Sequence, residues 1–548
     1  SVYKSAWIDD NTVYLMDMRK PKEQRTLLKM DPINSDVFIQ LIDKEKIAKD
    51  ILSAVGRTDT TMYLEWPSSF SSSGEFGLYT FEDDIYLLDI KNQDYTRITR
   101  TKNVEKAARF SPDGKKISFV RENDIYIYDI DTKREKRITF TGTDTNLNGT
   151  VSWVYWEEIF GRRDIGYWWS DDSEALAFLN TDESEVTKMH YVDWKPAAPE
   201  LITQRYPKAG TKNPEVKLGI IELESTKIKW VELGQYEYLC RVKWLPDNRR
   251  LSVQTMNRAQ TELDLFFVDR ATGKNVKKIF TEKDKGWVNI TDDLYFLKNS
   301  FMWQSERNGF AHLYQFSYDG KLISQVTDGE WALRSSGGTF WTRQSVVHID
   351  EKSRKVYYTS MKESSVERHL YRSSFDGKSM EKISGPSGVH KIYFSESGDM
   401  YMDIFSDRDS PPTQLIHSSN GDIMHTLIGD RPEIKKAFKA KYPKWDLSQP
   451  RIINAAQMLA AAINKAGTAD DMVAVASALE GMEFDSKLLG TKVLMRAKDH
   501  QAIQNVHVGI HTDDVDIDYD NSGYGVKTYA TVEMASADSP TTCKMKRP

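Results

Sequence analysis

The chain has 548 residues, which is more than one hydrophobic core usually organises, so we expect at least two structural units. Its net charge of -6, without a basic stripe interleaved with aromatic residues, argues against nucleic-acid binding. No apolar run is long enough to cross a bilayer, and the two cysteines, Cys240 and Cys543, lie far apart, which argues against a disulfide framework.

The chain opens with a predicted strand, TVYLMDM, and a polar stretch at residues 20–57, whose segment VFIQLIDKEKIAKDIL predicts a brief helix or a loop. From Met62 a longer pattern begins, and its clearest copy is ARFSPDGKKISFVRENDIYIYDIDTKREKRITF. That copy holds four short strands joined by polar turns, and variants recur at intervals of about 40 to 50 residues. Alternation such as DIYIYDI buries one strand face, and turns such as SPDG, SYDG and SFDG tolerate positive φ. The pattern predicts a mainly β fold, a β-propeller.

One stretch, VSWVYWEEIFGRRDIGYWW at residues 151–169, interrupts these repeats. It combines seven aromatic rings with two adjacent carboxylates. Ser152 or Thr150 could cap a short helix in this stretch, and Gly161 could end it.

The two carboxylates belong to Glu157 and Glu158. Ionised carboxylates that lose water need a partner, so a pair beside large apolar rings predicts a site for a small cation. An ammonium group has three donors and suits such a pair. The alternative is a solvated acidic turn in which Arg162 and Arg163 are the ion-pair partners.

Two later segments of the predicted propeller are also informative. In QTMNRAQTELD, Asn257, Arg258 and Gln260 put polar groups where a strand would otherwise be apolar. They could line a central tunnel or a substrate face, and hydrogen bonding between blades is an equally favoured alternative. In YEYLCRVKW, the alternating pattern places Cys240 in a strand and predicts a buried thiol.

The composition changes near residue 450. Apolar residues recur at helical spacing in AAQMLAAAINKAG and DDMVAVASALEGM, and KVLMRA predicts a strand, so this part should form a small α/β segment. Counted as a calcium loop from Asp516, the acidic run TDDVDIDYDNSG has Asn521 where the loop needs glycine, and Lys527 follows where it needs glutamate. No HExxH or CxxC pattern is present. We therefore expect no metal and no cofactor.

Several long motifs resemble one known family. SWVYWEEIFGRRDIGYWWS, ITQRYPKAGTKNP, QTMNRAQTELDLFFVD and GWVNITDDLYFL are similar to the β-propeller of bacterial dipeptidyl peptidase IV, and the resemblance extends from the first residues to about Trp445. It implies eight blades. In that family paired glutamates bind the free α-amino group of the substrate, which implies this role for Glu157 and Glu158. Further candidates for lining the substrate face are Tyr155, Trp156, Asn257 and Arg258.

The remainder resembles a different family. MRAKDHQAIQNVHVG and its neighbours are similar to the C-terminal portion of periplasmic leucine-binding and branched-chain amino-acid-binding proteins. We therefore expect a propeller at residues 1–429, a connector at 430–450 and an α/β fragment at 451–548. A dipeptidyl peptidase IV also needs an α/β-hydrolase domain with a G-x-S-x-G nucleophile motif, which this sequence lacks. We predict no catalytic residue here and no cleavage by this chain alone.

Together, the resemblances predict the substrate-recognition propeller of a dipeptidyl peptidase IV-type serine peptidase. Its expected partners are peptides with a free N-terminus, and its expected location is periplasmic or otherwise exported. One alternative is a non-enzymatic scaffold that binds peptides or proteins. A second, supported by the tail alone, is an amino-acid-binding receptor of an ABC transporter.

Overall fold

The computed structural model describes residues 2–34, 37–56, 63, 65–337, 344–407, 410–433, 450–486, 491–514 and 525–538. The chain divides into two compact units, Ser1–Lys435 and Lys436–Pro548. Cys543 and most of the acidic run at residues 512–523 lie outside the described residues.

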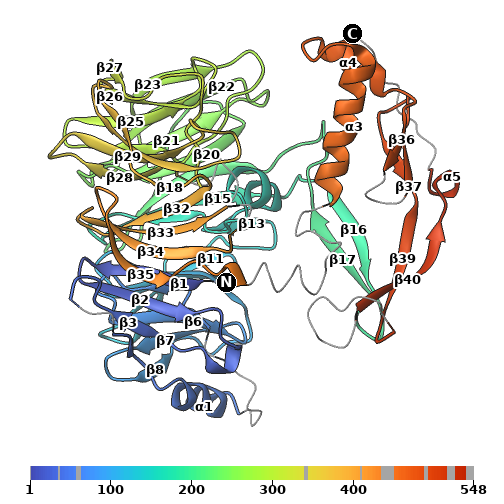
Figure 1. Cartoon of the computed structure of the whole chain (residues 1–548). Coiled ribbons are helices and arrows are strands. Elements are labelled where there is room, and N and C mark those ends of the chain that lie inside the picture. The colour runs from blue at the N-terminus through green and yellow to red at the C-terminus, as the bar shows by residue number, and fades with distance from the viewer. Residues whose placement is uncertain are drawn as a thin grey trace. The chain divides into compact units, whose positions relative to one another are not determined.

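The first unit consists of antiparallel sheets that follow one another along the chain (Figure 1). Sheet 1 contains β1 (Tyr3–Asp9), β2 (Thr12–Asp17), β3 (Leu28–Met30) and β4 (Ile39–Gln40). Sheet 2 contains β5 (Ser69–Phe70), β6 (Phe76–Phe81), β7 (Asp84–Asp89) and β8 (Asp94–Arg97). Sheet 3 contains β9 (Glu105–Phe110), β10 (Lys116–Arg121), β11 (Asp124–Asp129) and β12 (Arg134–Arg137).

Sheet 4 has an additional strand and carries a separate two-stranded ribbon. The sheet contains β13 (Asn146–Asn148), β14 (Tyr167–Trp169), β15 (Ala175–Asp182), β18 (Glu215–Glu222) and β19 (Ile228–Trp230). The ribbon, inserted between β15 and β18, is formed by β16 (Lys188–Asp193) and β17 (Glu200–Arg205).

The remaining sheets of this unit return to four strands each. Sheet 5 contains β20 (Tyr238–Trp244), β21 (Arg250–Met256), β22 (Glu262–Asp269) and β23 (Asn275–Lys283). Sheet 6 contains β24 (Leu294–Phe296), β25 (Ser300–Ser305), β26 (His312–Ser317) and β27 (Leu322–Gln325). Sheet 7 contains β28 (Val346–Asp350), β29 (Lys355–Ser360), β30 (His369–Ser374) and β31 (Met380–Lys382), and sheet 8 contains β32 (Val389–Phe394), β33 (Met400–Ser406), β34 (Thr413–Ser418) and β35 (Ile423–Ile428).

The sheets close into a ring. Buried apolar clusters span neighbouring sheets, and one of them joins sheet 1 to sheet 8 around Val13 and Met402. At the same junction the Tyr3 N–H donates to the Gln414 side chain over 2.9 Å, and β1 lies beside β34 and β35 (Figure 1). A ring of antiparallel sheets packed face to face is a β-propeller, so the predicted mainly β fold is confirmed. The count of eight blades stays a prediction.

A hydrogen-bonded pair recurs at the start of the third strand of several sheets. In sheet 2, Thr99 Oγ1 donates to Asp84 over 3.0 Å and accepts from the Ile85 N–H over 2.9 Å. The two side chains are 15 residues apart in sequence. The same separation recurs in the pairs Asp124–Thr139, His312–Thr327 and His369–Ser384. In these four sheets the pair ties the third strand to the chain that follows the fourth strand, so it fixes the hairpin that these two strands form.

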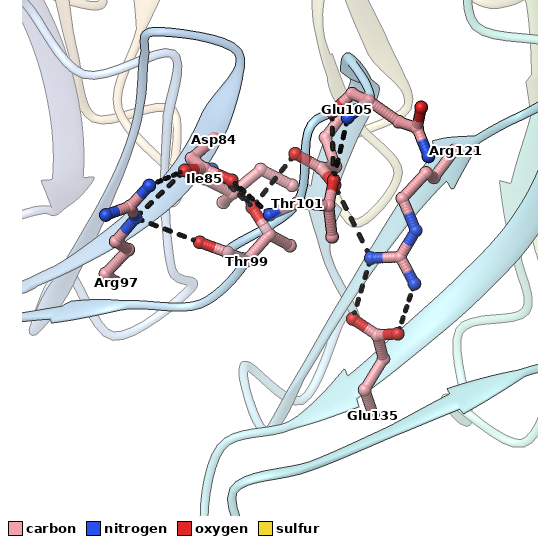
Figure 2. Close-up of polar contacts among 9 residues, drawn as sticks. Asp84, Ile85, Arg97, Thr99, Thr101, Glu105, Arg121 and Glu135 are labelled. Carbon is pink, nitrogen blue, oxygen red and sulfur yellow. Dashed lines mark hydrogen bonds and ion pairs between the residues drawn. The ribbon is translucent and has the colours of Figure 1, made fainter. Parts of the chain in front are cut away.

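A buried polar network joins sheets 2 and 3 (Figure 2). The hydroxyls of Thr99 and Thr101 lie 3.0 and 2.8 Å from the Glu105 carboxylate oxygens. Arg121 donates to Glu105 over 3.4 Å and also bonds to Glu135. Burial raises the pKa of Glu105 above its ordinary value, and the contacts with Thr101, Thr99 and Arg121 offset only part of this rise. The network offsets part of the cost of burying a carboxylate between the sheets.

Helices are few in the described part of the first unit. The polar stretch for which we expected a helix or a loop contains α1 (Lys44–Ala54), after a short 3-10 turn at Lys22–Gln24. Asp43 begins α1 by accepting from the Lys46 N–H over 3.1 Å, so the helix alternative is correct.

The second unit contains the elements predicted for the tail. Its helices are α3 (Pro450–Ala466), α4 (Met472–Leu479) and α5 (Met534–Ala537). Its strands are β36 (Glu483–Ser486), β37 (Thr491–Met495), β38 (Ala502–Gln504), β39 (Val506–Thr512) and β40 (Gly525–Val532). The two predicted helices and the KVLMRA strand are confirmed. None of the described helices combines the length and the apolar character that a membrane span requires.

Candidate functional site in the turn of Glu157 and Glu158

The glutamate pair lies on a loop inserted into the first strand of sheet 4, which is formed by β13 and β14. We call the first strand of each sheet its inner strand. β13 and β14 both pair with β15, and the loop leaves between them. At its base the Gly166 N–H donates to the Gly149 carbonyl over 2.9 Å, and each glycine also bonds to Leu179. At Gly149 φ is +78°, and a Cβ would lie 2.7 Å from the Ile125 side chain. Glycine is therefore required where the loop leaves the strand.

The loop begins with a short helical turn, as predicted. Residues 153–159 are helical, and Tyr155–Ile159 form a π-helix. Ser152 accepts from the Tyr155 N–H through its hydroxyl over 3.4 Å, which satisfies a free donor at the start of the turn. The Phe160 N–H donates to the Tyr155 carbonyl over 2.7 Å, the bond of a π-helix, and such turns are frequent at functional sites. Gly161 follows the turn with φ +56°.

The two carboxylates have different surroundings. Glu157 is half-buried and forms a two-point ion pair with Arg162, with both N···O distances at 2.9 Å. This hydrogen bonding lowers the pKa of Glu157. Glu158 is exposed, and within the described part of the chain it has no hydrogen-bond or ion-pair partner. Arg162 thus forms the ion pair that the alternative interpretation predicted for the glutamate pair. Arg163 instead bonds to Asp292 over 2.8 Å.

The ion pair of Glu157 is open to solvent on its cationic side. The Arg162 side chain is 70% exposed, and its backbone φ is +67°. Exposed ion pairs contribute little to stability because water screens them and side-chain entropy opposes them. An incoming cation could therefore exchange with Arg162, so this pair does not close the site.

The other sequence candidates beside the pair take different positions. Tyr155 does not line a surface: its side chain is completely buried, and its hydroxyl accepts from the Leu239 N–H over 3.0 Å. Trp156 is half-buried, with the Arg162 guanidinium 5.9 Å from its ring centre. Tyr155 thus anchors the turn in the core, and Trp156 remains a candidate for contact with a ligand.

Asn257 and Arg258 stabilise the turn between β21 and β22. Asn257 accepts from the Thr261 N–H over 2.9 Å. Arg258 is exposed and donates to Glu237 over 2.6 Å and to the Thr211 carbonyl over 2.7 Å. Both residues line a cavity of about 730 Å³ at this turn. Their contacts support the structural alternative, in which polar side chains hold neighbouring segments together.

Sequence reasoning missed Arg241, which contacts the glutamate turn, and Asp292, which bonds to Arg241 and Arg163. Arg241 and Asp292 line a cavity of about 880 Å³ together with Phe160, Arg163 and residues from the inner strands of several sheets. The available signal for Arg241 was a charged residue next to Cys240 in the predicted strand YLCRVKW. Beside it, Cys240 is buried as predicted, and burial raises the pKa of its thiol to about 12.

Among the residues that the structure describes, no group of three or more His, Cys, Asp or Glu side chains is arranged to hold a metal ion.

The Glu183 carboxyl, which lies beside sheet 4, should make the stability of the protein depend on pH. Glu183 follows β15, and burial raises its pKa to about 7 from 4.5, although Arg205 lowers it. A raised folded-state pKa adds stability that is present below the unfolded value and is lost as pH rises through the folded value. Glu183→Gln removes this dependence. We expect the melting temperature of the variant, relative to the original protein, to rise between about pH 5 and about pH 8 in thermal unfolding. A difference that stays constant with pH would contradict the assignment.

The fold agrees with comparisons to known proteins. Residues 72–412, more than half of the chain, match the family model described as the dipeptidyl peptidase IV (DPP IV) N-terminal region. The chain therefore belongs to this family.

Individual relatives are dipeptidyl peptidases of fungi and bacteria. The chain is 28% identical over 324 residues to dipeptidyl peptidase 4 of Arthroderma otae, covering 55% of this chain and 40% of the relative. It is 25% identical over 336 residues to dipeptidyl peptidase 4 of Trichophyton rubrum, covering 56% and 42%. The crystal structure of Porphyromonas gingivalis dipeptidyl peptidase 4 is similar with a TM-score of 0.67 and 25% identity, covering 80% of this chain and 61% of that one. The chain thus spans about two fifths of the length of these curated relatives.

The tail matches a different family. Residues 430–510 match the family model described as periplasmic binding protein. This match is short and includes α3, α4 and the sheet of β36, β37 and β38.

Proposed function

We propose that the propeller recognises peptides with a free N-terminus, as the substrate-binding part of a dipeptidyl peptidase IV-type serine peptidase. In this proposal Glu157 and Glu158 bind the α-ammonium group. The observation that carries it is the placement of adjacent glutamates on a turn inserted into an inner strand, in a chain of this family. The proposal concerns recognition, because the residues that carry it lie in the propeller.

The charges of the turn suit an ammonium ligand. Glu158 offers an exposed carboxylate, and the hydrogen bonds from Arg162 lower the pKa of Glu157. An ammonium group can donate to both carboxylates while it replaces the exposed Arg162 guanidinium. Charge-assisted hydrogen bonds of this kind distinguish a free amine from a blocked one by roughly one to two orders of magnitude in affinity.

A calorimetric titration with two forms of one tripeptide tests the proposal. One form has a free N-terminus, and the matched control carries an N-acetyl group. We expect the free form to bind between about ten and about one hundred times more tightly. Equal affinities would show that the glutamate pair is not an ammonium site and would favour the scaffold alternative.

The proposal has two further parts, the location of the protein and the role of its tail. The family resemblance suggests an exported location, and cell fractionation tests it. The match of residues 430–510 suggests a leucine or branched-chain amino-acid site in the tail as an alternative function. Titration of the chain with leucine or valine tests that alternative, and saturable binding would support it.

A further inference from the structure

Side chains from neighbouring segments hold the carbonyl end of the glutamate turn. Arg241, on β20 in sheet 5, donates from Nη1 to the Ile159 carbonyl over 2.9 Å, and its guanidinium lies 5.4 Å from the centre of the Phe160 ring. Arg163 donates from Nε to the Phe160 carbonyl over 2.9 Å. A helix end leaves such carbonyls without partners inside the helix, and cations stabilise them. Both arginines therefore fix the direction in which the turn ends.

Asp292, which precedes β24 in sheet 6, connects the two arginines. Its Oδ2 accepts from Arg163 over 2.8 Å, and its Oδ1 accepts from Arg241. The side chains of Arg241 and Asp292 are only 10% and 14% exposed. Burial alone would raise the pKa of Asp292, but the two guanidinium groups bring it below its ordinary value. We call Arg163, Arg241 and Asp292 the clasp.

The backbone of β20 is shaped for this contact. The register between β20 and β21 shifts between Leu239 and Arg241, which makes Cys240 the extra residue of a β-bulge. On one side of the bulge, the Leu239 N–H donates to the Tyr155 hydroxyl at the start of the turn. On the other side, Arg241 reaches the end of the turn. Bulges redirect side chains in this way and are common next to active sites.

The geometry points to Arg241 and Asp292 as positioning residues that orient Glu157 and Glu158 toward the peptide ammonium group. This inference rests on the proposed function. Arg241 acts on the backbone of the turn, because it donates to the Ile159 carbonyl and not to the carboxylates. Asp292 acts through Arg241 and Arg163, which donate to the two terminal carbonyls. Without the clasp, the carbonyl end is free to move, and the two carboxylates lose their fixed relation to each other.

Two conservative variants test the inference. Asp292→Asn keeps the shape of the side chain and removes its charge. Arg241→Lys keeps the charge but cannot contact Asp292 and the Ile159 carbonyl at the same time through two guanidinium nitrogens. The matched control is Glu222→Gln, which breaks a comparable ion pair with Arg270 at 2.7 Å, where the side chains are 24% and 12% exposed. Each protein is titrated with the free and the N-acetylated tripeptide, and hydrogen exchange is followed in the amides of residues 155–162.

We expect the ratio of affinities for the free and the N-acetylated tripeptide to fall at least about tenfold in both clasp variants. The amides of residues 155–162 should exchange faster in these variants than in the original protein. Glu222→Gln should keep the preference even where its melting temperature falls by a similar amount. If the clasp variants keep the preference of the original protein, the positioning role is refuted and the clasp only stabilises the fold. If the original protein itself does not discriminate, the proposed function fails, and the orienting role fails with it.

Discussion

Replacement of both Glu157 and Glu158 by glutamine is expected to remove the preference for a free N-terminus. The loss should be roughly one to two orders of magnitude in affinity for the free tripeptide, with little change for the acetylated one. The melting temperature should stay nearly unchanged, because one carboxylate is exposed and the other forms an exposed ion pair. Calorimetry and thermal unfolding measure the two quantities on the same samples.

Two controls make this prediction specific. Glu185→Gln removes an exposed acidic group that is paired with Lys212, and it should leave the preference unchanged. Arg162→Gln frees Glu157 from its internal partner, so it should strengthen binding of the free amine. A fall of several degrees in melting temperature without loss of affinity would assign the glutamate pair to structure.

Asp124→Ala is expected to cause the largest loss of stability among the variants considered. Asp124 is completely buried and accepts from the Thr139 hydroxyl over 2.6 Å and from the Asn148 amide over 2.9 Å. It also bonds to Arg137 and to the Gly142 N–H. Its removal leaves the buried Thr139 and Asn148 donors without their acceptor, which should lower the free energy of unfolding by about 3–5 kcal/mol. Urea denaturation followed by circular dichroism measures this loss.

The effect should extend to the glutamate turn. Asn148 is the last residue of β13, so its bond to Asp124 holds the strand directly before the loop leaves at Gly149. The matched control is Asp131→Ala, an exposed acid between β11 and β12, which should stay within about 0.5 kcal/mol of the original protein. A similar small change for Asp124→Ala would contradict the structural importance of the recurring pair.

Much of the fold could be predicted because its signals are local. Alternation in segments such as DIYIYDI and turn residues such as those of SPDG act within a few residues, so the strands and the propeller were predictable. The helix that follows Asp43 was ambiguous because it is short, with 11 residues, and lies within a polar stretch. The recurring pair was missed because its first residue changes from Asp84 and Asp124 to His312 and His369. A fixed separation of 15 residues before a hydroxyl was the available signal.

The glutamate pair could be identified, but its surroundings could not. Arg162 was a predicted alternative partner because it is five residues from Glu157. Arg241 lies 82 residues from Ile159, and Asp292 lies 129 residues from Arg163, so no local pattern relates them. Ring closure brings the inner strands of distant sheets together, and only the fold shows which charges meet there.

A crystal structure of the chain with a bound tripeptide would show directly whether Glu157 and Glu158 hold the peptide N-terminus. We predict the peptide amine nitrogen within about 3 Å of carboxylate oxygens of both glutamates, with Arg162 displaced from Glu157. A peptide bound elsewhere, with the Arg162 ion pair intact, would contradict it.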